Sequence, residues 1–103
     1  MHLELKPEEL ELLAWQVSNE VVNGFKVDQF SERIGVSKED FKSMANRLRS
    51  AAKTVPILLN THEGQIFRNA LALVIDELGI EEFHTRTGHE YEDGCLLLQK
   101  LSQ

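Results

Sequence analysis

The chain has 103 residues, of which 42% are hydrophobic, enough for one modest core, and its formal net charge of −6 argues against a general affinity for nucleic acid. It contains no run of about 18 apolar residues, and its first residues lack the basic-then-apolar order of a signal peptide, so we expect a cytoplasmic protein without a membrane partner. Cys95 is the only cysteine, which excludes an intrachain disulfide and is compatible with a reducing compartment.

The charges are unevenly distributed along the chain. Residues 26–53 carry seven basic and four acidic side chains, a net charge of +3. Residues 1–25 have a net charge of −4 and residues 76–103 a net charge of −5. A basic middle segment therefore lies between two acidic ends.

The first half of the chain predicts three helices. Pro7, followed by two glutamates, is typical of a helix start, and an apolar stripe at helical spacing continues to Val21 before Gly24. Asp28 is expected to cap a short helix that ends at Ile34, before Gly35. Ser37 with Asp40 suggests a capping box for a third helix that reaches about Lys53.

The second half begins after Pro56, which disfavours a helical conformation at the preceding residue. Residues 57–59 (Ile-Leu-Leu) are expected to form an apolar connector that tucks into the core or makes a brief helical turn. Asn60 with Glu63 repeats the capping pattern, and a long apolar stripe then stops at Gly79. The remainder predicts a short helix, a break near Gly88 and a last helix.

An internal similarity appears when the chain is shifted by 53 residues. Residues 27–48 then align with residues 80–101, with six identical columns out of 22, including Phe30/Phe83, Arg33/Arg86 and Gly35/Gly88. We therefore expect an all-α fold: a single domain over residues 1–103, a compact bundle of about six helices. It would contain two divergent units, each a helix followed by a helix-turn-helix, related by a pseudo-twofold axis. Their bounds are about 7–53 and 61–103, with a connector at 54–60.

The segment 27–48 also carries a helix-turn-helix pattern. Seven places of that pattern are filled by suitable residues, namely Phe30, Ser31, Ile34, Gly35, Val36, Phe41 and Met44. On these residues the segment resembles the helix-turn-helix superfamily of DNA-binding proteins.

The resemblance implies that the helix after Ser37 would enter the major groove of DNA. Its outward residues, facing bases or phosphates, would be Ser37, Lys38, Glu39, Lys42, Ser43 and Asn46. Backbone contacts would come from Arg47, Arg49 and Lys53. The same packing pattern also occurs in proteins that bind no nucleic acid, so a protein-binding surface on these residues stays open.

The second unit departs from this pattern. Thr87 and His89 occupy places where apolar residues are expected, and Gly94 replaces the residue equivalent to Phe41, so we do not expect this unit to read DNA. The apolar run 95–98 indicates either burial in the core or contact with another subunit, which leaves a homodimer through the C-terminal helix open.

Several single residues have two interpretations. Arg33 and Arg86 are expected to form an ion pair or a helix cap within their own units. Trp15 is expected in the core with its indole at the edge, and less readily as a contact for a partner. The residues around His84 and His89 include metal-capable types without a zinc spacing, and no catalytic constellation is present, so we expect no cofactor, no metal and no enzymatic activity.

These observations predict a small regulatory or adaptor protein, non-enzymatic, that binds another protein through a helix-turn-helix-type scaffold. The alternative is a sequence-specific DNA-binding transcription regulator that uses residues 38–53. A lower alternative is an acidic inhibitor or immunity-type protein that covers a basic site on its target.

Overall fold

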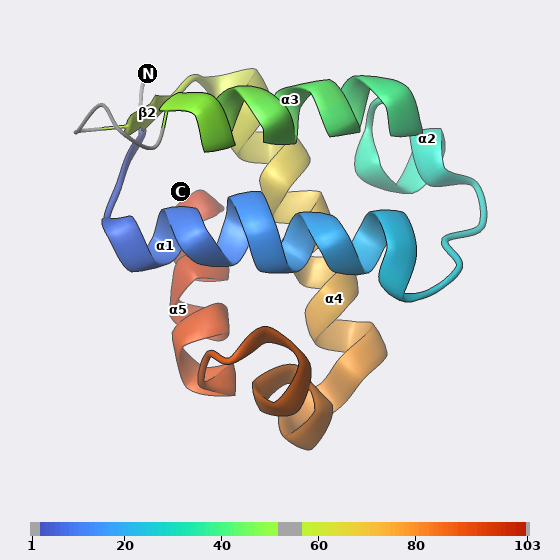
Figure 1. Ribbon diagram of the computed structural model, residues 1–103, viewed down its shortest axis with the longest axis vertical. Helices are drawn as coiled ribbons and strands as arrows, with labels where there is room; N and C mark the ends of the chain where they lie inside the picture. The colour runs from blue at the N-terminus through green and yellow to red at the C-terminus, as the bar shows by residue number, and fades with distance from the viewer. Residues whose placement is uncertain (1–2, 52–56, 103) are drawn as a thin grey trace.

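A computed structural model describes residues 3–51 and 57–102 and is mostly helical, with a small two-stranded sheet (Figure 1). Its elements in chain order are β1 (Leu3–Leu5), α1 (Pro7–Glu11), η1 (Leu12–Val17), η2 (Glu20–Gly24), α2 (Phe30–Ile34), α3 (Lys38–Ala51), β2 (Ile57–Leu59), α4 (Thr61–Thr87) and α5 (Tyr91–Leu101). The coarse expectation of a helical fold is confirmed. Within the described residues, no helix is both long and apolar enough to span a membrane.

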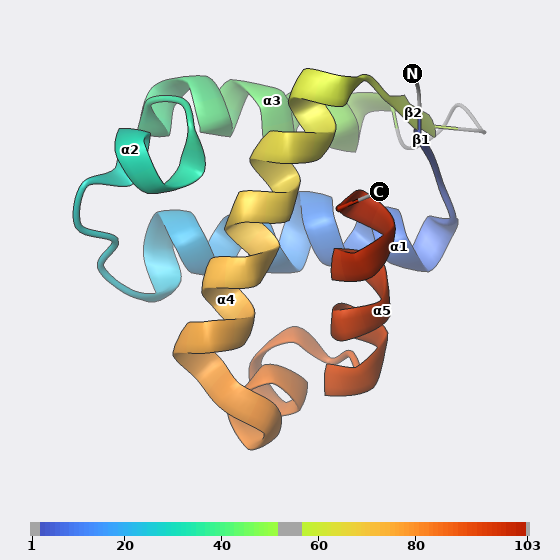
Figure 2. The same cartoon turned by 180° about the vertical axis from the view of Figure 1, so that it is seen from behind.

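The helices form two layers. The segments α1, η1 and η2 follow one another in a single rod, residues 7–24, which we call the first helix. The first helix and α3 run side by side on one face, and α4 crosses behind both of them (Figure 1). Seen from the other side, α4 and α5 form the second layer (Figure 2). The apolar core lies between these layers and takes residues from both halves of the chain.

Local signals in the sequence predicted most helix ends correctly. The rod begins at Pro7, and the Ser37 hydroxyl accepts a hydrogen bond from the Asp40 amide (3.1 Å). At the start of α4, Asn60 and Glu63 form the reciprocal capping box. Gly79 has a left-handed, non-helical backbone (φ 72°) that interrupts α4, because glycine adopts such a conformation without a steric penalty.

Two expectations about local structure need correction. Asp28 does not cap α2, because the N-cap residue is Gln29 in a left-handed conformation (φ 54°) without a side-chain cap, and Asp28 instead pairs with Lys26. The expected end of the third helix near Lys53 lies outside the described residues, as does Pro56, and α3 is described as far as Ala51.

The connector at 57–59 tucks into the core as expected, with Ile57 and Leu59 buried, but it is not a helical turn. It is the strand β2, which pairs antiparallel with β1 so that Leu5 faces Ile57 and Leu3 faces Leu59. This pairing joins segments far apart in the sequence, so the local pattern did not indicate it.

Packing explains the three positions of the second half that depart from the helix-turn-helix pattern, namely Thr87, His89 and Gly94. Gly94 makes room for the fully buried Phe83, since a Cβ on Gly94 would lie 2.6 Å from the Phe83 ring. The buried Thr87 hydroxyl donates to the Phe83 carbonyl (2.6 Å) and accepts from the His89 amide (3.1 Å). The His89 ring pairs with Glu11 of α1 (2.5 Å). These contacts tie the α4–α5 turn together and to the first helix.

Arg86 connects the two halves of the chain, contrary to the expectation of a contact within its own unit. Its Nη2 lies 2.8 Å from Oε1 of the buried Glu20 and donates to the Gly24 carbonyl (3.1 Å). The Glu20 oxygen lacks a hydrogen bond of good geometry, so its attraction to Arg86 is ionic. Arg33, the equivalent residue, is exposed and makes no ion pair within the described part of the chain.

Candidate functional site

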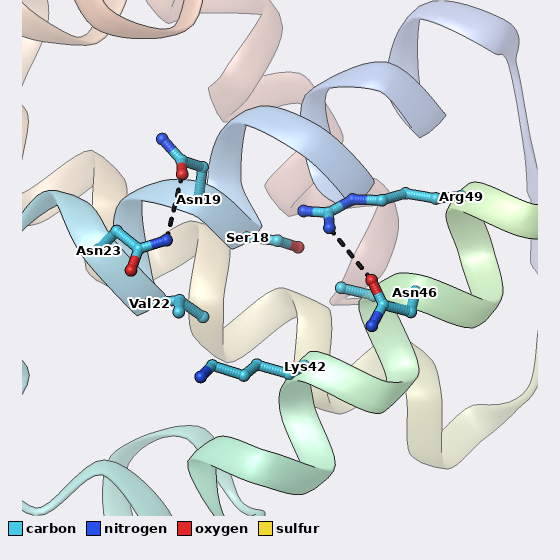
Figure 3. A pocket seen from close by; sticks show the side chains of 8 residues that line it. Ser18, Asn19, Val22, Asn23, Lys42, Asn46 and Arg49 are labelled. Carbon is cyan, nitrogen blue, oxygen red and sulfur yellow. Dashed lines mark hydrogen bonds between the residues drawn. The ribbon is translucent and has the colours of Figure 1, made fainter.

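A groove of about 220 Å³ runs between the first helix and α3 (Figure 3). Its lining residues are Ser18, Asn19, Val22 and Asn23 from the first helix, and Lys42, Ala45, Asn46 and Arg49 from α3. The groove brings together part of the basic segment and a polar stretch of the first helix. It is the candidate binding site of the chain.

The first helix is widened where it borders the groove. Leu12–Val17 and Glu20–Gly24 both have π-helical geometry, which is rare and is found frequently at functional sites. Two side chains bind carbonyls of the first π-helical segment: the Ser18 hydroxyl donates to the Leu13 carbonyl (2.7 Å), and Arg49 Nε donates to the Ala14 carbonyl (2.7 Å). Arg49 therefore fixes α3 against the widened part of the first helix.

The buried stripe of α3 determines which of its side chains face the groove. The stripe consists of Phe41, Met44, Ala45 and Leu48. At about 100° per residue, Lys38, Lys42 and Arg49 then fall on one flank of the helix, beside the first helix. Arg47 falls on the opposite flank, where it lies 3.7 Å from Glu63 of α4. The outward face between these flanks carries Glu39, Ser43, Asn46 and Ser50. The basic residues of α3 are thus divided between two sides.

The groove is cationic although the chain as a whole is acidic. None of the described residues that line it is Asp or Glu, and Lys42 and Arg49 supply two positive charges. Lys42 is exposed and makes no hydrogen bond or ion pair with any described residue. Arg49 is half-buried, and its Nη1 also donates to Asn46 Oδ1 (3.2 Å). An unpaired lysine ammonium in a recess lined without carboxylates favours an anionic ligand group.

The two cations lie toward opposite ends of the groove. The Lys42 side chain is directed toward Val22 and Asn23, and the Arg49 guanidinium toward Ser18 (Figure 3). Asn19 and Asn23 bond to each other between their amides (3.4 Å), and each retains further donor capacity. The lining therefore offers two charged ends and amide donors along one wall.

No family model, curated protein or solved structure matches the chain.

Three of the predicted contact residues line the groove, namely Lys42, Asn46 and Arg49. The other described ones have different positions: Ser37 caps α3, Lys38 and Ser43 are exposed outside the groove, and Arg47 is on the far flank. Lys53 lies outside the described residues. The described residues of the basic segment therefore do not form one surface.

Sequence reasoning missed the wall that the first helix contributes. This wall carries the uncharged polar residues Ser18, Asn19 and Asn23, which face α3 across the groove. The signal that could have found them is their position beside the apolar stripe, where Ser18 and Asn19 follow Val17 and Asn23 follows Val22.

A second hollow, of about 450 Å³, lies between α1 and α5. Leu12 and Leu97 are buried there and Leu96 is 57% exposed. The charged residues around it include the ion pair of Lys100 with Glu9 (2.8 Å). Among residues 3–51 and 57–102, no three His, Cys, Asp or Glu side chains are arranged to hold a metal ion.

Proposed function

We propose that this chain is a small non-enzymatic regulatory or adaptor protein that acts by binding another protein, and that the groove between the first helix and α3 is its contact site. The observation that carries the proposal is the cationic, carboxylate-free lining of this groove in a chain of net charge −6. A cationic groove favours partners that present negative charge, and this charge complementarity increases the rate of association. The proposed location is the cytoplasm, which suits the unpaired thiol of Cys95.

The proposed scaffold is a duplicated helix-turn-helix unit. Gly35 and Gly88 are equivalent at the 53-residue shift, and both end helices in a left-handed conformation (φ 111° and 77°). Phe30 packs edge-on against Phe41 in the first unit. Phe83, the equivalent of Phe30, packs edge-on against a different ring in the second unit, that of Tyr91. These parallels support divergence from one ancestral unit.

Purification of the tagged chain followed by cross-linking and mass spectrometry tests the proposal. We expect a specific protein partner, cross-linked to residues near the groove, that is lost with Lys42→Glu. Arg47→Glu removes the same positive charge on the opposite flank and should retain the partner, so it controls for net charge. Finding no specific protein partner, together with tight binding of the chain to a defined DNA site at physiological salt, would refute the adaptor function.

DNA binding through α3 is the alternative function, and the exposure of Lys38, Lys42 and Ser43 favours it. Opposing it, the basic residues are divided between two flanks and the outward face carries Glu39. If α3 does bind DNA, Lys42→Ala and Arg47→Ala should both weaken binding and flatten its salt dependence. A duplex that binds equally tightly to both variants would exclude this use of α3.

Self-association through α5 is a further proposal about partners. The exposed Leu96 stands beside the α1–α5 hollow, whose rim carries both Lys100 and Asp93, and mixed charge of this kind suits an isologous contact. Leu96→Gln should then shift a dimer to monomer in light scattering. A chain that is monomeric at all concentrations before substitution would rule the dimer out.

A further inference from the structure

The spacing of the two cations in the groove carries information about the shape of the partner. Lys42 and Arg49 are seven residues apart on α3, which corresponds to about 10 Å along the helix axis. They are directed toward opposite ends of the groove (Figure 3). Their backbone positions thus span two turns of α3, and a ligand that uses both presents two anionic groups across a similar span.

An α-helix provides this separation on one face. Side chains two turns apart on a helix are displaced by about 10 to 11 Å and point in nearly the same direction. In an extended segment, side chains on one face recur at about 7 Å or about 13 Å, and not at the two-turn rise of a helix. The charge spacing thus favours a helical partner over an extended peptide.

The lining of the groove is partly apolar. Val22 is half-buried on one wall and Ala45 is buried on the other, and both have small side chains. The volume of about 220 Å³ accommodates side chains and not a whole helix. A partner helix would lie over the groove and direct one apolar side chain onto Val22 and Ala45. That side chain would be about one helical turn from each of the two acidic side chains.

We infer that the groove binds an acidic amphipathic helix of a protein partner, whose carboxylates two turns apart contact Lys42 and Arg49 and whose apolar side chain between them contacts Val22 and Ala45. This inference rests on the proposed function as a protein-binding adaptor. The Arg49 guanidinium is already held by the Ala14 carbonyl and Asn46, so little side-chain entropy is lost when it binds a carboxylate. The Lys42 amine has no competing partner.

Duplex DNA fits these features less well than an acidic helix does. Arg49 is half-buried in the groove, whereas a DNA duplex requires phosphate contacts on an accessible surface that follows its backbone. The acidic terminal segments, with net charges of −4 and −5, would repel a long polyanion more than a short helix with two carboxylates. DNA is therefore one of the outcomes that the experiment must separate.

The test uses fluorescent alanine-rich helical peptides of about 18 residues, longer than the ~12 to 15 residues below which isolated helices are marginal in water. The matched peptide has Glu at two positions seven residues apart and Leu four residues after the first Glu. The control peptide has the same composition, with the two Glu residues five positions apart so that they point to different sides. Anisotropy titrations with the full chain compare both peptides with a random-sequence DNA duplex and with inorganic phosphate as competitor.

We expect the matched peptide to bind more tightly than the control peptide. Lys42→Ala should weaken its binding about tenfold, the loss expected for a hydrogen bond to a charged group, and Lys42→Arg should restore it. Arg47→Ala, which removes the same charge outside the groove, should change the affinity less than about twofold. Lys42 is exposed and without bonds, so circular dichroism should show an unchanged fold in its variants.

Four results would overturn the inference: no binding of the matched peptide, equal binding of both peptides, equal losses in Lys42→Ala and Arg47→Ala, or binding confined to DNA or phosphate. These are distinguishable from failure of the adaptor function. If a cellular protein partner still cross-links to Lys42→Glu, the acidic-helix inference fails while the adaptor function stands. If no partner is found and the chain binds a defined DNA site tightly at physiological salt, the adaptor function itself fails.

Discussion

Alanine at Gly94 should destabilise the protein, although alanine is the better helix former. Gly94 lies inside α5 and is buried against the ring of Phe83. An added Cβ would lie 2.6 Å from Phe83 Cζ and 3.0 and 3.3 Å from two further ring atoms. The ring is rigid and fully buried, so relieving the overlap requires movement of the packed core.

The magnitude follows from two opposing effects. Replacing a helical glycine by alanine stabilises by about 0.5–1 kcal/mol, and overpacking a filled core costs about 1–3 kcal/mol. Gly94→Ala should therefore lower the free energy of unfolding by up to about 2 kcal/mol. Gly64, in α4, is the matched control, because an added Cβ there meets no atom within 4 Å. Gly64→Ala should raise the free energy of unfolding by about 0.5–1 kcal/mol.

Urea and thermal denaturation, followed by circular dichroism, would measure both variants. A difference of at least about 1 kcal/mol between them corresponds to a gap of about 4 °C or more in Tm for a domain of this size. Phe83→Leu should cost less in the Gly94→Ala background than alone, with a coupling of about 0.5 kcal/mol or more. The reasoning is refuted if Gly94→Ala is as stable as Gly64→Ala, or if the two residues show no coupling.

Two further predictions concern Arg86 and Tyr91. Arg86→Met should lower the free energy of unfolding by about 2 kcal/mol, because the substitution leaves Glu20 buried without its cation. This loss is smaller than the ~3–5 kcal/mol expected on breaking a fully buried ion pair, since Arg86 is partly solvated. Arg33→Met, at the equivalent exposed position, should stay within about 0.5 kcal/mol in the same urea titration, and equal losses would contradict the assignment. The negative charge of a Cys95 thiolate raises the pKa of the Tyr91 phenol above 10.0, with smaller contributions from burial and other neighbours. Because Tyr91 is the only tyrosine, an ultraviolet titration should show the midpoint moving down with Cys95→Ala, and an unchanged midpoint would exclude this cause.

The candidate site was only partly predictable from the sequence. The basic segment, the capped start of α3 and its apolar stripe indicated which residues of that helix are outside the core. They did not indicate that Arg47 would pair with Glu63 while Lys42 and Arg49 face the first helix. Which flank meets which neighbour depends on how the helices are placed in space, and a one-dimensional pattern does not contain that placement.

The sequence by itself determined where most of the described helices begin, and where several end, because proline at a first turn, a side chain that caps free amides and a glycine in a left-handed conformation all act within a few residues. Pro7, Ser37, Asn60 and Gly79 are examples. The tertiary structure alone decided the long-range contacts: the β1–β2 pairing, the Arg86–Glu20 ion pair, the space for Phe83 over Gly94, and the bond from Arg49 to Ala14 that closes one end of the groove. Each of these joins groups whose encounter depends on the packing of the whole chain, so local propensity carries no signal for them.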